Sequence, residues 1–413
     1  MKNINLISFS FRRGGAGIAA SKFAEMLIRE SRRVTLLSQD SSGKLQFTKR
    51  VLSWGLGKLQ INKNKVKHSL NIFSYKPLLL LIKNRTREDI FHFHWINNDT
   101  LSVFDFDKIP SGSIITLHDE WMYCGSEHYY DVFSNEYDFS RGYSFFSKGS
   151  FGFGWRYIIW RIKFNKLKNR NDILYTVPSR WMLERAKSSL ILQNARVLLL
   201  PNPIDTDIFS PRENTHRIRI EYSFSDDDFV ICFGAVDGVH NPLKGGGILE
   251  EAFEIISGFL SNDELDKIKL VVFGQKNKCE FKKFKKFKCV SLGHINDPGE
   301  LACLFSMSDC VIVPSLVESF GQVAAEALAC GTPVVAFKTS GLMDIVIDGF
   351  NGFLAEPFKA SSLAEKIINL YHLSADERIR LAAGARSHIV DNFSYDIISR
   401  KYLTIIDSAS EII

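Results

Sequence analysis

Short, wholly apolar runs alternate along the chain with longer segments in which apolar residues recur every three or four positions. The clearest unit lies at residues 311–354: Val311–Val313 is apolar, a helical segment follows, and Gly331-Thr332-Pro333 ends it before a second apolar run, Val334–Phe337. Apolar runs without polar alternation are typical of parallel strands buried on both faces. Gly and Pro are typical of helix ends. The pattern therefore predicts a strand, a helix and a second parallel strand.

The same alternation divides the chain into two sets of elements. The first set of predicted strands is Ile4–Phe9, Val34–Leu37, Ile90–Trp95 and Ile114–Leu117; the second is Phe229–Phe233, Leu270–Phe273, Val290–Ile295, Val311–Val313 and Val334–Phe337. Strands that alternate with helices build doubly wound parallel sheets. We predict an α/β fold with an N-terminal domain at residues 1–203, a second domain at 204–392 and a C-terminal helix at 393–413.

The turn before the helix of residues 311–354 consists of small residues and one aromatic, Ser319, Phe320 and Gly321. Unpaired backbone N–H groups and the positive end of the helix dipole make such a turn suitable for an anion, such as a phosphate. Glu318 and Glu326 flank this turn. On one helix they would lie about 12 Å apart, farther than the roughly 5 Å between the carboxyls of a retaining glycosidase. We expect them to contact different parts of one long ligand; the alternative is a charge that favours the helix dipole and an ordinary surface glutamate.

Other candidate residues follow predicted strands. A glycine-rich loop containing Gly15, Ala16 and Gly17 comes after the first strand and before a helix predicted over Ile18–Glu30. Only glycine lets a ligand approach the main chain so closely, although close packing is an equal alternative. His118 and Asp119 follow the strand Ile114–Leu117, at the edge where open α/β sheets bind ligands. His118 can hydrogen-bond a sugar hydroxyl or stabilise developing charge; the alternative is a structural loop histidine.

Metal ligation is a weaker interpretation of two further patterns. His92 and His94 lie on one face of a predicted strand, and His118 or His128 would complete a site, but most such pairs are packing or hydrogen-bonding residues. Asp-x-Asp occurs at residues 105–107, 205–207 and 226–228, which shows how little this pattern means alone. We therefore predict no metal cofactor.

The second domain contains a cation suited to a diphosphate. Lys244 is followed by three glycines at a predicted helix start, and a lysine there can pair with phosphate oxygens.

Three ordered motifs in the second domain resemble family 4 retaining glycosyltransferases. They are Glu318-Ser-Phe-Gly-Gln-Val-Ala-Ala-Glu326, Ala329-Cys-Gly-Thr-Pro-Val-Val and Asp348-Gly-Phe-Asn-Gly-Phe-Leu354. The segments 116–128 and 177–185 resemble bacterial surface-polysaccharide transferases of this family. The resemblance implies the GT-B fold: two Rossmann-like domains that face a cleft, with the last helix crossing back to the N-terminal domain.

The resemblance also implies roles for individual residues. Glu318 would face the donor sugar, the amides of Ser319, Phe320, Gly321 and Gln322 the diphosphate, Glu326 the ribose, and His294 and Ile295 the base. Gly15, Ala16, Gly17 and Asp119 would lie on the acceptor or sugar side, as would Asn202, which sits in a hinge where Pro203 replaces a common glycine. The family commonly has an Arg upstream of the lysine at position 244, and there is none between Phe233 and Lys244, so Lys244, either alone or with a residue from elsewhere in the chain, pairs with the phosphates.

Composition indicates the compartment and the partners. Seven cysteines without paired spacing indicate reduced thiols, and we find no signal-peptide pattern, so we expect a cytoplasmic protein. The net charge is +6, and residues 44–87 and 155–170 contain basic residues but no Asp or Glu. These stretches suit peripheral contact with an anionic inner membrane; the equal alternative is a solvated basic surface beside a packed helix. We find no recognisable nucleic-acid-binding module.

These features together predict an enzyme. We expect a glycosyltransferase that moves a sugar from a nucleotide-diphosphate sugar to a glycan or lipid-linked acceptor with retention, in bacterial surface polysaccharide or lipopolysaccharide synthesis. The resemblance implies that the sugar is a hexose. The alternatives are a sugar-nucleotide epimerase on the same fold and a non-catalytic nucleotide-binding protein at a membrane surface.

Overall fold

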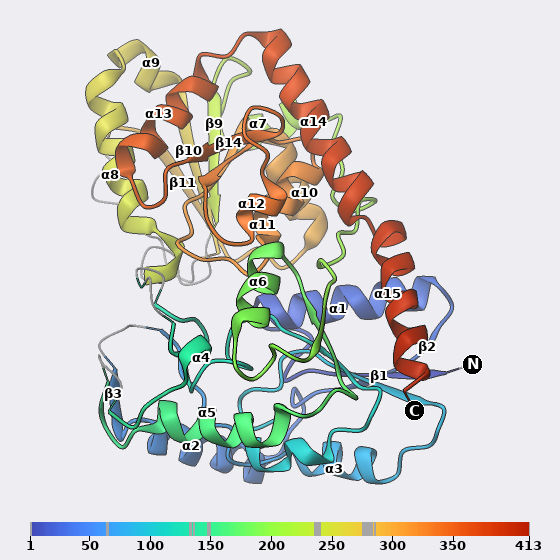
Figure 1. Ribbon diagram of the computed structural model, residues 1–413. Helices are drawn as coiled ribbons and strands as arrows, with labels where there is room; N and C mark the ends of the chain where they lie inside the picture. The colour runs from blue at the N-terminus through green and yellow to red at the C-terminus, as the bar shows by residue number, and fades with distance from the viewer. Residues whose placement is uncertain are drawn as a thin grey trace. The chain divides into compact units, whose positions relative to one another are not determined.

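The structure is a computed structural model. It describes residues 2–62, 66–131, 134, 137–146, 150–234, 241–274, 284 and 286–412 of the 413-residue chain. The chain separates into two compact units, residues 1–203 with 398–413 and residues 204–397. Each unit contains a six-stranded sheet whose described strand pairs are all parallel (Figure 1). The predicted α/β class with two Rossmann-like domains is therefore confirmed.

The sheet of the first unit has the strand order β2-β1-β4-β5-β7-β8. Its strands are β1 (Asn3–Ile7), β2 (Arg33–Leu37), β4 (Asp89–Phe93), β5 (Ile114–Thr116), β7 (Leu174–Val177) and β8 (Arg196–Leu199). A separate antiparallel pair joins β3 (Gln60–Asn62) and β6 (Ser150–Gly152). The helices are α1 (Gly14–Arg29), α2 (Lys44–Gly57), α3 (Lys76–Lys83), η1 (Val103–Lys108), α4 (Asp138–Arg141), α5 (Trp155–Leu167) and α6 (Arg180–Ser188).

The sheet of the second unit has the strand order β11-β10-β9-β12-β13-β14. Its strands are β9 (Phe229–Gly234), β10 (Ile268–Phe273), β11 (Lys288–Gly293), β12 (Cys310–Val313), β13 (Val334–Phe337) and β14 (Gly352–Ala355). The helices are α7 (Thr215–Glu221), η3 (Pro242–Lys244), α8 (Gly246–Phe259), α9 (Asn262–Lys267), α10 (Pro298–Met307), α11 (Gln322–Ala329), α12 (Leu342–Ile345), α13 (Ala360–Tyr371) and α14 (Ala375–Phe393).

Alternate residues of the second sheet pack on its two faces. Phe229, Ile231 and Phe233 of β9 belong to the core formed with α8, α9 and α13, whereas Val230 and Cys232 belong to the core formed with α10, α11 and α14. Both faces are thus covered by helices (Figure 1). This double burial explains why the strands read as continuous apolar runs in the sequence.

In each sheet the direction in which successive strands are added reverses once. At that point the loops after two neighbouring strands leave the sheet in opposite directions. In the second sheet β9 lies at the centre, and the chain first builds outward through β10 and β11 before β12 starts on the other side of β9. The loops after β9 and β12 therefore leave the carboxyl edge in opposite directions, which is where doubly wound sheets bind ligands. In the first sheet the corresponding neighbours are β1 and β4.

The last helix, α15 (Tyr395–Ser410), joins the second unit to the first, because residues 398–413 belong to the first unit. Tyr402 is fully buried there; its hydroxyl hydrogen-bonds His92 Nδ1 of β4, and its ring lies 5.4 Å from that of Phe23 in α1. Ser399 Oγ donates to Glu30 Oε1 at 3.1 Å. The prediction that the C-terminal helix returns to the N-terminal domain is confirmed.

Two further observations concern the cysteines and the helices. The structure describes six of the seven cysteines, and each of the six is a free thiol. In the described part of the chain, none of the helices combines the length and the apolar character that a membrane span requires.

Candidate functional site

Glu318 lies in the loop that connects β12 to α11, and hydrogen bonds hold it from three sides. Its backbone N–H donates to Ser340 Oγ at 2.9 Å, and its carbonyl accepts from Gly341 N at 2.8 Å. Its side-chain Oε1 accepts from Ser315 Oγ at 2.8 Å. The carboxylate is therefore fixed at the carboxyl edge of the sheet by its own loop and by the loop after β13.

Lys244 lies beside this carboxylate. Its ammonium forms an ion pair with Glu318 Oε1, and both side chains are partly exposed, by 29% and 18%. The two loops also touch through the backbone, since Leu316 N donates to Leu243 O at 2.8 Å. A Cβ on Gly245, whose φ is +67°, would overlap the carbonyl oxygen of Pro314. Only glycine permits this approach, so the Lys244 turn and the Glu318 loop form one structural unit.

Two helices begin at this pair of loops with uncapped amino ends. Gly321, with φ +105°, precedes α11, and a Cβ there would lie 2.9 Å from Leu342 Cδ2. Gly245 precedes α8. Neither helix receives a side-chain cap hydrogen bond from its N-cap residue, a glycine in both cases. Each amino end carries roughly half a positive charge, so the carboxyl edge between β9 and β12 is suited to an anion.

Glu326 lies inside α11 and only 5% of it is exposed. Gln322 Nε2 donates to Glu326 Oε1 at 2.9 Å, one helical turn away. Gln322 Oε1 is buried and has no hydrogen-bond partner in the described structure. Because Glu318 precedes the helix that contains Glu326, the separation calculated for a shared helix does not apply. The two carboxylates remain distinct groups, one in the loop and one in the helix.

The other residues predicted to bind the sugar donor differ in which of their atoms are accessible to a ligand. Phe320 is buried, and its ring packs against Phe393 at 5.7 Å, so only its backbone is available to a ligand. Ser319 is buried as well. His294 and Ile295 follow β11, the outermost strand of this half of the sheet; His294 is exposed, and Ile295 is partly buried against the core.

The glycine-rich segment of the first unit is not a loop, as the sequence suggested, but the first turn of α1. A Cβ on Gly17 would lie 2.7 Å from Ser10 O, whereas one on Gly15 would meet nothing within 4 Å. Close packing against the chain that leaves β1 therefore explains the glycine at Gly17 and lets the helix begin four residues earlier than predicted. Ala16 is partly buried. Gly15 is exposed, and close packing does not require a glycine at that position.

His118 follows β5 and interacts with a second histidine. His118 Nε2 and His94 Nδ1 share a hydrogen bond of 3.0 Å, and the His94 ring lies 4.1 Å from that of His92. Burial lowers the pKa of His118 to about 4, although Asp119 acts in the opposite direction. Burial also lowers the pKa of His94 well below its ordinary value. The histidines are thus neutral near pH 7. Among the described residues, no set of three or more His, Cys, Asp or Glu side chains is arranged to hold a metal ion.

Asp119 is the centre of a hydrogen-bonded group. Its Oδ2 accepts from Trp95 Nε1 at 2.8 Å and pairs with His128 Nδ1 at 2.6 Å, and its Oδ1 accepts from Trp121 N at 3.0 Å. Burial alone raises the pKa of Asp119, but His128 and the hydrogen bonds outweigh burial and lower it. Asp119 thus fixes the segment after His118. Sequence reasoning did not identify Trp95 or His128 as its partners.

Asn202 follows β8 and is 5% exposed. Its side-chain Oδ1 is buried without a hydrogen-bond partner in the part of the chain that the structure describes.

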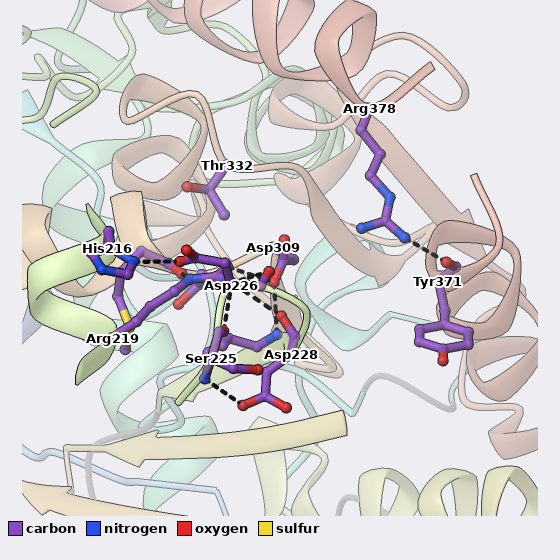
Figure 2. A network of polar contacts seen from close by, with 12 residues as sticks. His216, Arg219, Ser225, Asp226, Asp228, Asp309, Thr332, Tyr371 and Arg378 are labelled. Carbon is purple, nitrogen blue, oxygen red and sulfur yellow. Dashed lines mark hydrogen bonds and ion pairs between the residues drawn. The ribbon is translucent and has the colours of Figure 1, made fainter. Parts of the chain in front are cut away.

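The acidic triplet Asp226–Asp228 lies at the opposite edge of the second sheet, where β9 and β12 begin. Figure 2 shows how Arg219 of α7 gathers this segment: its guanidinium donates to the carbonyls of Asp226 and Asp228, at 3.3 and 3.0 Å, and to Asp309 Oδ2 at 2.8 Å. Asp309 Oδ2 also accepts from Val230 N at 2.7 Å. The triplet therefore belongs to a network that closes the amino edge, remote along the strands from Lys244 and Glu318.

Comparison with known proteins agrees with this geometry. Residues 236–388 match the family described as glycosyl transferases group 1. This match lies within the second unit. The chain is 29% identical over 249 residues to the lipopolysaccharide 1,2-N-acetylglucosaminetransferase of Salmonella typhimurium, a match that covers 56% of this chain and 61% of that protein. The match thus spans about three fifths of the curated relative's length.

Solved structures share the fold over nearly the whole chain. A glycosyltransferase from Rickettsia africae has a TM-score of 0.64 at 17% identity and covers 99% of this chain and 98% of its own. The Anabaena protein HepE, solved with UDP and glucose, has a TM-score of 0.63 at 18% identity and covers 99% of this chain and 100% of its own. At these identities the likeness establishes the fold, which is the GT-B class that the motifs implied.

The structure brings some predicted residues together and adds others. Lys244, Glu318 and the amino end of α11 converge within the second unit, and His118 and Asp119 share one hydrogen-bonded region of the first. Sequence reasoning missed Ser315, Ser340 and Gly341, which hold Glu318. The available signal was the run Thr339-Ser340-Gly341, one residue after the strand Val334–Phe337, since small polar residues at the carboxyl end of a parallel strand lie at the ligand-binding edge.

Proposed function

We propose that this protein is a glycosyltransferase that uses a nucleotide-diphosphate sugar. The observation that carries the proposal is the group at the carboxyl edge between β9 and β12, where Lys244, Glu318 and the uncapped amino end of α11 meet in a glycosyl transferases group 1 domain. The Anabaena protein of the same fold was solved with UDP and glucose, and the Salmonella relative is named for N-acetylglucosamine transfer. Both support a nucleotide-sugar donor.

The charges at this edge suit a diphosphate. Lys244 contributes one positive charge, and the amino ends of α8 and α11 contribute roughly half a charge each. Each phosphate of a nucleotide-diphosphate sugar carries one negative charge, so these three groups offset the charge of the diphosphate, while the carboxylate of Glu318 adds one negative charge beside it. In this proposal, a donor phosphate takes over the hydrogen bond that Lys244 makes to Glu318. The positive groups then stabilise the negative charge that develops on the leaving nucleoside diphosphate.

The remaining predicted residues receive proposed roles from their settings. Glu318 faces the donor sugar, and Glu326 the ribose. His118 is neutral near pH 7, because burial lowers its pKa to about 4, so it can donate or accept a hydrogen bond to a sugar hydroxyl without carrying charge. The exposed backbone around Gly15 would serve the acceptor. We further propose retention by same-face attack of the acceptor hydroxyl, since no second carboxylate is assigned as a nucleophile.

The acceptor that we propose is a glycan or a lipid-linked sugar of a bacterial surface polysaccharide or lipopolysaccharide. The support is the lipopolysaccharide substrate in the name of the Salmonella relative and the resemblance of segments 116–128 and 177–185 to surface-polysaccharide transferases.

A donor screen tests the proposal directly. Thermal unfolding is measured with UDP-, GDP-, ADP- and dTDP-sugars, and we expect one nucleotide class to raise the melting temperature. Lys244→Ala should weaken that donor about 10- to 100-fold, because a hydrogen bond to a charged group contributes roughly 1.5–3 kcal/mol. Glu356→Gln is the matched control: Glu356 is an exposed carboxylate of the same unit, paired with Lys359, and its loss should leave donor affinity unchanged. Failure of all four classes to bind would refute the proposal.

Turnover separates the candidate reactions. With the donor that binds, nucleoside diphosphate should be released faster when membrane glycolipid extract from a polysaccharide-producing bacterium is added, and Glu318→Gln should lower that rate about 100-fold or more with an unchanged melting temperature. Conversion of the donor sugar without any acceptor would identify an epimerase instead. Polymer synthesis in cells that survives Glu318→Gln would identify a non-catalytic role.

A further inference from the structure

Helix α2 of the first unit buries polar side chains and exposes apolar ones, the reverse of an ordinary surface helix. The residues it buries are polar: Gln46 Nε2 donates to Asp99 O at 2.8 Å, and Ser53 hydrogen-bonds the Asp99 carboxylate. The large residues it exposes are apolar, with exposed fractions of 73% for Leu45, 59% for Phe47, 50% for Val51, 53% for Leu52, 66% for Trp54 and 56% for Leu59, which follows the helix. We call these six residues the α2 face.

The exposed apolar residues of α2 form two ridges rather than isolated positions. Phe47, Val51 and Trp54 are spaced by four and three residues and so form one ridge, while Leu45 and Leu52, one heptad apart, form a second. Single exposed apolar residues are ordinary, but a contiguous apolar surface marks an interaction site.

A neighbouring segment extends the face. Phe153 N donates to Leu59 O at 3.3 Å, and the Phe153 side chain is 49% exposed. Trp155, the first residue of α5, donates from its Nε1 to Leu56 O at 2.8 Å and lies 4.7 Å from the Phe153 ring. This contact fixes α2 beside α5 in the first unit (Figure 1). The apolar surface is therefore rigidly mounted rather than a loose tail.

Cations accompany the apolar side chains of α2, and the helix itself contains no Asp or Glu. Lys44, Lys49, Arg50 and Lys58 lie in or directly after the helix, and residues 44–87 contain no Asp or Glu. Lys58 Nζ lies 4.9 Å from the Trp54 ring, and Arg50 Cζ lies 5.8 Å from the Phe47 ring. A helix that combines exposed aromatic and aliphatic residues with Lys and Arg is suited to the interface of an anionic bilayer.

The other basic stretch does not offer such a surface. In α5, Ile159 and Leu167 are fully buried in the core of the first unit and Trp160 nearly so. Lys163 is also buried, with its Nζ donating to Gly125 O at 2.8 Å. For residues 155–170 the structure favours the packed helix with a solvated basic side. Helix α3 likewise buries Leu78 and Ile82.

We propose that the α2 face, together with Phe153, docks on an anionic lipid bilayer, with α2 parallel to the surface and its aromatic side chains at the headgroup level. Charge complementarity selects this occupant. A second copy of the chain would bring the same Lys and Arg residues to the contact, and those charges would repel. The inference rests on α2 itself and holds whether or not the chain transfers sugars.

Vesicle flotation with the full chain tests the proposal. We expect binding to vesicles of phosphatidylethanolamine with about 30% phosphatidylglycerol, little binding to pure phosphatidylcholine, and weaker binding as salt rises. The double variant Phe47→Ser with Trp54→Ser should lower the partition coefficient for anionic vesicles at least about tenfold. Its melting temperature should match that of the wild type, because both side chains are mostly exposed.

Phe259→Ser provides the matched control, since Phe259 is an aromatic residue of the second unit that is 70% exposed. This variant should bind like the wild type. Equal binding of the double variant and the wild type would overturn the proposal, as would absence of binding to anionic vesicles at low salt. Sedimentation that shows wild-type dimers and monomers of the double variant would overturn it in favour of a second copy.

Discussion

Glu127 is the residue whose replacement most directly tests how the region around His118 is held. It is 2% exposed, and the guanidinium of Arg156 grips its carboxylate with two hydrogen bonds, Nη2 to Oε1 at 3.0 Å and Nε to Oε2 at 3.1 Å. The hydroxyl of Tyr143 also donates to Oε1. The pair joins α5 to the segment that carries His118 and Asp119. Glu127→Gln removes the charge while it nearly preserves the shape.

The expected loss of stability can be estimated in two ways. Burial alone raises the pKa of Glu127, but Arg156 outweighs burial and lowers it from 4.5 to about 2. At about 1.4 kcal/mol per unit, a shift of roughly 2.5 units corresponds to about 3 kcal/mol of stability at neutral pH. Removal of one partner from a buried ion pair costs about 3–5 kcal/mol by mutational precedent. Both arguments predict that Glu127→Gln lowers the free energy of unfolding by about 3 kcal/mol.

Urea unfolding at a series of pH values is the assay. Because the folded-state pKa is depressed, the native state binds fewer protons than the unfolded state between pH 4.5 and about 2. The stabilisation is therefore complete above pH 4.5 and is lost as the pH falls toward 2. The difference between wild type and Glu127→Gln should be full at pH 7 and clearly smaller at pH 3.5.

Two further variants make the result decisive. Arg156→Met added to Glu127→Gln should recover part of the loss, because it removes a largely buried guanidinium that has lost the Glu127 carboxylate and retains a longer contact of 3.5 Å to Asp138. The exposed pair of Glu356 and Lys359 supplies the control, and Glu356→Gln should leave unfolding unchanged. A Glu127→Gln variant as stable as the wild type, or a difference that stays constant down to pH 3.5, would refute the reasoning.

Two other predictions concern the contact between the Lys244 turn and the Glu318 loop, and the packing of the last helix. Gly245→Ala should lower the melting temperature by several degrees in calorimetry and weaken donor binding, because the added Cβ overlaps the Pro314 carbonyl. Gly247→Ala is the control, because a Cβ at that position meets nothing within 4 Å, and it should have neither effect. Tyr402→Phe should cost about 1 kcal/mol and speed amide exchange in α15, because the hydroxyl no longer bonds His92; unchanged exchange would contradict this.

The strands of the second unit were predictable because burial on both faces imposes a local pattern. The apolar run Val334–Phe337 coincides with β13, and Val311–Val313 differs from β12 by one residue. The beginning of α1 was not predictable, since Gly17 has low helix propensity and joins the helix because it packs on Ser10 O. Helix propensity is a property of the local sequence, whereas the contact between Gly17 and Ser10 O depends on the path that the chain takes after β1.

The sequence by itself determined the α/β class, the two domains and the motif that contains Glu318 and Glu326, because periodicity and residue order are local properties of the chain. Only the tertiary structure decided that Lys244 pairs with Glu318, since the two residues are 74 positions apart and meet where two strands that are neighbours in the sheet release their loops. It likewise decided that α2 exposes its apolar side and α5 buries its own. Two basic helices of similar composition differ in this way because the rest of the fold covers only one of them.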